Sequence, residues 1–127
     1  MGIFSGLMGN ASEMDIEKLR EEYSKILTEN ENLERAYKLV RDLFIFTNKR
    51  IILVDKQGMT GKKIEYHSIP YENIRHYSVE SSGHFDLDAE LKLWVAGLTN
   101  PIIKQFNKKC NIYDVQKTLS EYILWKF

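Results

Sequence analysis

The spacing of apolar residues divides the chain into a helical part, a long alternating part and a second helical part. Near the amino end, apolar residues recur every three or four positions, the spacing of one helix face. These residues are Ile16, Leu19, Tyr23, Ile26 and Leu27. The stripe predicts a helix over about 12–29, starting near Ser12, whose hydroxyl can accept from the first free amides. Asp15 suits the positive end of such a helix.

From about residue 33 to residue 107 the period shortens to two, the period of a β-strand. The segments that follow it are LERAYKLVRD, LFIF, IILVD, KKIEYHSI, NIRHYSVES, DLDAELKLWV and IIKQF. Short turns rich in Gly, Asn, Ser and Pro separate them. Seven short strands with short connections favour one antiparallel sandwich or barrel.

Two of these segments show how the strands should be buried. IILVD is a continuous apolar run, which is typical of a strand covered on both faces. DLDAELKLWV alternates almost perfectly, which predicts one buried face and one wet face. Its predicted buried side consists of Leu87, Ala89, Leu91, Leu93 and Val95. Its predicted wet side consists of Asp88, Glu90, Lys92 and Trp94.

The helical period returns at the carboxyl end. Asn111 is a good N-cap residue, and Asp114 lies in the first turn that follows. The apolar stripe of this segment consists of Ile112, Val115, Leu119, Tyr122 and Ile123. We therefore expect a helix over about 111–125 that covers the open end of the bent sheet.

The segment TNKR, Thr47 to Arg50, lies between two apolar strands and allows two interpretations. It could display its two cations to a phosphate group, or it could simply turn the chain so that the strands pair. Asn48 can take the positive φ of a tight turn. We favour the turn, with Arg50 pairing locally as the next strand begins.

Composition narrows the class of protein. The 127 residues suit one domain, which we place at 12–127 after an apolar segment at 1–11. Lys plus Arg equals Asp plus Glu at 18 each, so no net field attracts nucleic acid or acidic lipid. The single cysteine, Cys110, excludes an internal disulfide and fits the reducing cytoplasm.

The apolar segment MGIFSGLMG lacks the basic start and long apolar run of a signal peptide. We expect it to pack on the domain or on a neighbouring subunit. The alternative is contact with a membrane surface.

At the level of whole blocks, FTNKRIILVDKQG and GHFDLDAELKLW resemble the bacterial pleckstrin-homology (PH-like) domain family. The likeness covers almost the whole chain. It implies a PH-like sandwich of seven bent antiparallel strands capped by a carboxyl-terminal helix, here with an extra amino-terminal helix. It also implies a protein of unestablished biochemical role, and some members resemble builders of cyclic rings.

Many eukaryotic members of this superfold hold inositol phosphates with Lys and Arg on a long loop between the first two strands. Here that connection is LVRD, with Arg41 and Asp42 at its centre. The Asp42 carboxylate would repel phosphate, so we expect no phosphoinositide binding.

Residues that could carry chemistry are few. His84, Asp86 and Asp88 share one face if HFDLD is extended, but alternate strand positions lie about 6.5 Å apart and meet one metal ion poorly. His67 and His76 are read as possible cross-strand neighbours in a sheet. No nucleophile elbow or phosphate-cradling glycine loop is present, so we assign no catalytic residue, no cofactor and no metal.

The remaining interpretation is an interaction module. Aromatic residues that could stack on bases lack an accompanying basic groove, so nucleic acid is not expected. We predict an outward interaction surface made of Tyr71, Tyr77, His84, Asp86, Asp88, Glu90 and Trp94. We expect a cyclic homo-oligomer, a pentamer first, that binds an unknown protein partner. The alternative function is a peripheral membrane module anchored by segment 1–11.

Overall fold

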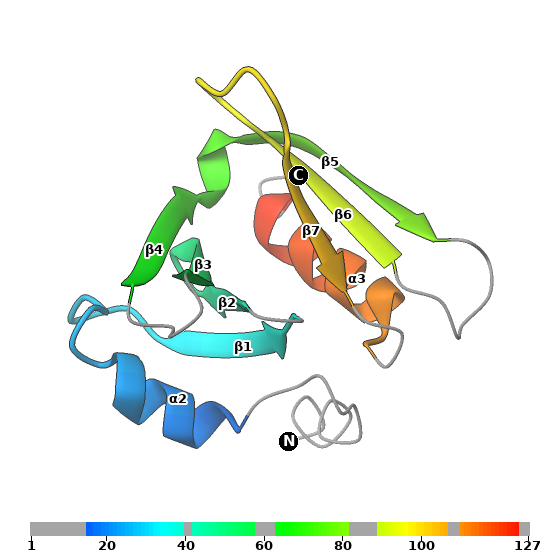
Figure 1. Cartoon of the computed structure of the whole chain (residues 1–127). Helices are drawn as coiled ribbons and strands as arrows, with labels where there is room; N and C mark the ends of the chain where they lie inside the picture. Colours follow the sequence, from blue (N-terminus) through cyan, green and yellow to red (C-terminus); the bar gives the residue numbers. More distant parts are fainter. Residues whose placement is uncertain (1–14, 40–41, 58–62, 82–88, 107–109, 125–127) are drawn as a thin grey trace.

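The computed structural model describes residues 15–39, 42–57, 63–81, 89–106 and 110–124. Seven strands form a four-stranded and a three-stranded antiparallel sheet (Figure 1). The strands are β1 Leu33–Lys38, β2 Leu43–Thr47, β3 Arg50–Gln57, β4 Lys63–Pro70, β5 Ile74–Ser81, β6 Ala89–Val95 and β7 Ile102–Phe106. The helices are α2 Ile16–Tyr23, the 3-10 helix η1 Tyr71–Asn73, and α3 Ile112–Ile123. The predicted seven strands and two helices are confirmed.

Each sheet is built from strands that are consecutive in sequence. The first sheet has the order β1-β2-β3-β4, and the second has the order β5-β6-β7. Helix η1 connects the two sheets, and α3 lies between them in Figure 1. This places the carboxyl-terminal helix over the interior of the bent sheets, as the resemblance implied.

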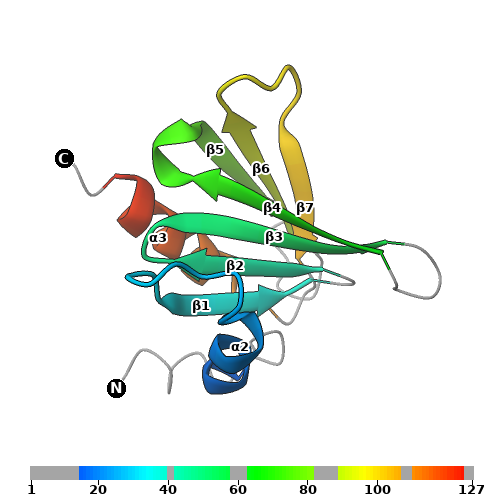
Figure 2. The same cartoon turned by 90° about the vertical axis from the view of Figure 1, so that its left-hand side faces the viewer.

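The central strands of the first sheet, β2 and β3, are covered on both faces. Phe44, Phe46, Ile51 and Leu53 belong to an inner core that includes residues of the second sheet and of α3. The alternate side chains, Leu43, Ile45, Ile52 and Val54, belong to a separate outer core that includes residues of α2. Figures 1 and 2 show α2 on the side of this sheet away from the second sheet. The continuous apolar run IILVD therefore marks a strand buried on both sides, as predicted.

Helix α3 begins where the sequence predicts. The Asn111 side chain accepts from the amides of Tyr113 and Asp114, at 3.1 and 3.3 Å. The apolar stripe buries Ile112, Val115 and Leu119 completely or nearly so.

Polar contacts fix α3 to the first sheet. The Tyr37 hydroxyl of β1 donates to Asp114 Oδ2 at 2.8 Å, and Arg35 Nη1 donates to Thr118 Oγ1 at 2.5 Å. Burial, together with the hydrogen bond to Asp114, raises the pKa of Tyr37 above its ordinary range. The hydroxyl therefore stays protonated and acts as a donor.

The amino-terminal helix is shorter than the predicted 12–29. Asp15 caps it, and it ends at Tyr23. The Ile26 carbonyl accepts instead from Arg50 Nη2 at 2.9 Å, and the Thr28 amide donates to the Glu31 carboxylate at 3.1 Å. Backbone groups that would continue the helix are thus bonded to these two side chains. The predicted start at Ser12 lies outside the described residues.

The strand β6 confirms its predicted alternation. Ala89, Leu91 and Leu93 are buried, whereas the residues between them are only partly covered. Leu87 and Asp88 lie outside the described residues.

We predict that Leu119→Ala will lower the free energy of unfolding by about 2–5 kcal/mol, because it opens a cavity in the inner core. Leu119 is fully buried, whereas Tyr113 on the same helix is 72% exposed. The matched control Tyr113→Ala should change stability by less than about 0.5 kcal/mol. Urea unfolding followed by circular dichroism measures both. Equal losses in the two variants would contradict the placement of α3.

Candidate functional site

The turn between β2 and β3 is shaped by Thr47. Its hydroxyl oxygen accepts from the amides of Lys49 and Arg50, at 3.0 and 2.9 Å, and the hydroxyl donates to the Glu31 carboxylate at 2.6 Å. The predicted positive φ at Asn48 is wrong: among the described residues only Gly97 has a positive φ. Because the Thr47 hydroxyl accepts hydrogen bonds from two backbone amides, the turn forms without a residue in the left-handed conformation.

Asn48 serves the turn through its side chain. Its Oδ1 accepts from the Asn32 amide at 2.7 Å, and its Nδ2 donates to the Asn30 carbonyl at 3.1 Å. The turn is thereby tied to the segment that precedes β1. The prediction that TNKR pairs two strands is confirmed, with a different backbone geometry.

Arg50 confirms the expected local pairing. Its Nε and Nη2 donate to the two carboxylate oxygens of Glu31 at 2.8 and 2.9 Å, and its Nη1 donates to Ser68 at 2.9 Å. The Glu31 side chain is only 1% exposed. One of the two cations in TNKR is therefore part of the scaffold and is not displayed to a ligand.

Glu31 keeps its charge despite this burial. Desolvation raises its pKa, but hydrogen bonds from Arg50, Thr47 and the Thr28 amide lower it further, and the net result is a pKa of about 2. The carboxylate is therefore ionised throughout the physiological range.

The second sheet carries a partly exposed polar face, which we call the outer face. It consists of His76, Ser78 and Glu80 of β5 and of Glu90, Lys92 and Trp94 of β6. The rings of His76 and Trp94 stack with their centroids 4.3 Å apart. Glu80 and Glu90 lie directly opposite each other across the two strands. Two carboxylates in this position favour a neighbouring cation.

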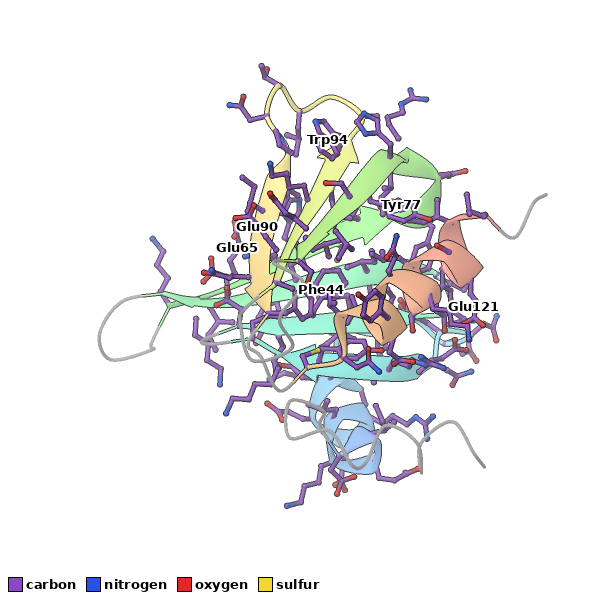
Figure 3. The ribbon with its side chains drawn as sticks, turned by 90° about the vertical axis from the view of Figure 1, so that its right-hand side faces the viewer. Phe44, Glu65, Tyr77, Glu90, Trp94 and Glu121 are labelled. Carbon is purple, nitrogen blue, oxygen red and sulfur yellow. The ribbon has the colours of Figure 1, made fainter. Side chains whose placement is uncertain are left out.

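The structure places only part of the predicted interaction surface on this face. Glu90 and Trp94 lie there, and Figure 3 shows Trp94 near the tip of the second sheet. His84, Asp86 and Asp88 lie outside the described residues.

Tyr71 and Tyr77 do not share the outer face. Tyr71 is 9% exposed and its hydroxyl donates to the Thr47 carbonyl at 2.5 Å. Tyr77 lies opposite Leu93 and is hydrogen-bonded to Ser120 of α3 at 2.7 Å (Figure 3). A register shift near the start of β5 changes which alternate positions point inward. The expectation that both tyrosines point outward is therefore wrong.

Strand β4 is an edge that the sequence did not single out. Within the described residues it pairs only with β3, and most of its side chains are exposed. Two of them are apolar: Ile64 is 38% exposed and Tyr66 is 41% exposed. On the second sheet, the edge strand β7 exposes Ile103 at 51%. The polar residues that alternate with Ile64 and Tyr66 in KKIEYHSI were the sequence signal for an exposed strand.

Other candidate chemistry is separated in space. His67 faces Leu53 in the first sheet and His76 faces Trp94 in the second, so they are not cross-strand neighbours as suggested. The described residues contain no group of three His, Cys, Asp or Glu placed to hold a metal ion. Asp42 pairs with Lys104 at 3.3 Å, whereas Arg41 lies outside the described residues. None of the described helices could span a membrane.

A four-stranded and a three-stranded antiparallel sheet closed by a carboxyl-terminal helix define the class of this protein as PH-like. A family model described as the bacterial PH domain matches residues 2–123. The chain belongs to the bacterial PH domain family, which confirms the resemblance.

Known proteins agree with this assignment. The chain is 55% identical over 121 residues to the Bacillus subtilis (strain 168) protein YjqA, covering 94% of this chain and 97% of that protein. A crystal structure of a pleckstrin homology domain from Shewanella amazonensis SB2B is 55% identical, with a TM-score of 0.82 over 94% of this chain and 97% of that one. A DUF1696 family protein with a pleckstrin-homology domain from Shewanella loihica PV-4 is 48% identical, with a TM-score of 0.81 over 90% and 97%.

We predict that acid will destabilise the protein through Glu31. Its pKa falls from an ordinary 4.5 to about 2 on folding, so the unfolded chain binds the proton first as the pH drops. The stabilisation, about 3 kcal/mol, is fully present above pH 4.5 and is lost as the pH falls towards 2. Unfolding by urea between pH 6 and pH 2 measures it.

The Glu31→Gln variant should be less stable than the parent protein at pH 6, and its stability should fall less steeply below pH 4.5. Glu21→Gln, on the exposed face of α2, is the matched control and should follow the parent protein. A parent-like pH dependence in Glu31→Gln would contradict the assignment.

Proposed function

We propose that this protein is a non-catalytic PH-like interaction module of the cytoplasm that self-assembles into a cyclic ring and binds protein partners. The observation that carries the proposal is the edge strand β4, which pairs only with β3 among the described residues and exposes Ile64 and Tyr66. An exposed edge strand with apolar side chains is a template for pairing with another chain.

The second copy is the favoured occupant of this edge. Strand β7 ends the other sheet and exposes Ile103, so one copy offers two different edges with apolar side chains. Joining β4 of one copy to β7 of the next is a head-to-tail contact, and such contacts close into a ring when the rotation divides a full turn. A pentamer remains the first expectation, carried over from the family resemblance.

The outer face would then be repeated around the ring. Trp94 and its stacked partner His76 supply aromatic surface, and Glu80 and Glu90 supply negative charge. Aromatic residues are enriched at protein interfaces. Several copies held together would strengthen a weak contact through avidity. A partner with a basic, partly apolar surface suits this face best.

A non-catalytic role agrees with the use of the most perturbed groups. The Glu31 carboxylate is bonded to Arg50 and to the Thr28 amide, and the Tyr37 and Tyr71 hydroxyls are bonded within the core. Perturbed pKa values often mark catalytic sites, but ion pairs that hold a fold perturb them too. Here burial raises the pKa of both tyrosines, and hydrogen bonds within the fold lower the pKa of Glu31 despite its burial.

We predict that the purified protein will be a homo-oligomer by light scattering at micromolar concentration. Ile64→Asp should shift it towards monomer, since a carboxylate at the contact is costly to bury. Tyr113→Asp is the matched control, because Tyr113 is also an exposed apolar residue but lies on α3. A strict monomer before mutation, or identical masses for both variants, would contradict the proposal.

A further inference from the structure

A pocket of about 450 Å³ opens where the β2–β3 turn, η1 and the end of α3 meet. Its lining includes Tyr122, Ile123 and Leu124 at the carboxyl end of α3, the part of that helix coloured red in Figure 1. Its lining residues come from three separate parts of the chain. They are Asn48, Lys49, Pro70, Tyr71, Glu72, Ile74, Arg75, Tyr122, Ile123 and Leu124. Pockets of this volume are typical of small-molecule sites.

The inner wall of the pocket is aromatic and rigid. The rings of Tyr71 and Tyr122 stack with their centroids 4.9 Å apart and an angle of 13° between them, and Phe46 stacks on the other face of Tyr122 at 5.7 Å. The Tyr71 hydroxyl donates to the Thr47 carbonyl, and the Tyr122 hydroxyl donates to Glu34. Both hydroxyls are therefore bonded within the protein, and the two tyrosines contribute ring atoms to the pocket lining.

Aliphatic side chains extend this apolar wall. Ile74 packs in the inner core, and Ile123 is partly buried against it. Leu124 is 50% exposed at the end of the helix. An apolar group that enters the pocket would cover these atoms and displace water from them.

The rim carries the charges. Lys49 and Arg75 are both exposed, and within the described part of the chain no ion pair holds either side chain. Glu72 is the third charged lining residue. Two cations and one carboxylate leave one net positive charge on the rim, which favours a single anionic group, and the negative end of the α3 dipole partly offsets this attraction. Lys49, the other cation of TNKR, thus lies beside a pocket, whereas Arg50 is paired with Glu31.

We propose that this pocket binds a carboxylate that carries an apolar side group, either as a free acylated amino acid or as the terminal residue of a peptide. The guanidinium of Arg75 can hold a carboxylate through two parallel hydrogen bonds, and Lys49 adds a second charge. The apolar side group lies against Tyr71, Ile123 and Leu124 of the pocket lining. The site does not require the ring assembly, so the two proposals fail independently.

The test is an amide-resolved NMR titration of the full chain in its native assembly. The probes are N-acetylphenylalanine and a six-residue peptide ending in Phe, each with a free carboxylate or with an amide in its place. We expect the carboxylate forms to bind with dissociation constants in about the millimolar range or tighter. The largest chemical-shift changes should be those of the Lys49, Arg75 and Ile123 amides.

Comparison of the two carboxylates identifies the source of the ligand. If both the peptide and N-acetylphenylalanine bind, the ligand is the carboxyl end of a peptide chain. If only N-acetylphenylalanine binds, the ligand is a small molecule. Equal binding of the amidated probes would overturn the proposal, as would shifts centred away from these amides.

Variants then test the two cations. Arg75→Gln and Lys49→Gln should each weaken binding by about fivefold, and the weakening should shrink at high salt. Both residues are exposed, so thermal unfolding should match the parent protein. Lys18→Gln, an exposed cation on α2 outside the pocket, is the matched control. Unchanged affinity in both rim variants would also overturn the proposal.

Discussion

The fold depends on the burial of β2 and β3, the central strands of the first sheet, on both faces. Alternate side chains of β2 and β3 enter two different cores, so that Ile51 and Leu53 face one way while Ile52 and Val54 face the other. An antiparallel sheet usually has one face in water. Because β2 and β3 have none, they need a cover on each side: α2 covers the outer side, and α3 together with the second sheet covers the inner side. Each helix is therefore required, because each covers a different core.

This constraint also decides which surfaces remain available. Helix α2 occupies the outer side of the first sheet, and α3 fills the interior between the sheets. Among the described residues, the surfaces left open by this packing include the outer face of the second sheet, the strand edges and the pocket at the end of α3. Each of these surfaces offers a different chemistry to a binding partner. The outer face is mixed aromatic and acidic, the strand edges are apolar beside open backbone, and the pocket is apolar beneath cations.

Periodicity predicted the strands and the carboxyl-terminal helix because burial repeats at a fixed interval within an element. It misplaced Tyr71 and Tyr77 for two distinct reasons. Tyr71 lies in η1, where no strand alternation applies, and Tyr77 follows a register shift that changes the inward positions of β5. The three-residue spacing from Ile74 to Tyr77 was the available signal, since an uninterrupted strand places apolar residues two apart.

The contacts that periodicity could not supply join residues far apart in the chain. Arg50 pairs with Glu31 across 19 residues, and Asn48 bonds to Asn30 across 18. Both contacts depend on how the segment before β1 crosses the turn, and no local pattern encodes that crossing. The length of the amino-terminal helix was overestimated for the same reason, because Arg50 takes the Ile26 carbonyl.

The same arrangement links the scaffold to the pocket. The Thr47 hydroxyl fixes the turn that carries Lys49, and the Thr47 carbonyl accepts a hydrogen bond from the Tyr71 hydroxyl. Tyr122 stacks between Tyr71 and Phe46, so the aromatic wall of the pocket is continuous with the inner core. A site preorganised in this way loses little conformational freedom on binding. The exposed cation Lys49 and the partly buried cation Arg50 are therefore parts of one structure: Arg50 holds the turn in place, and the turn positions Lys49 beside the pocket.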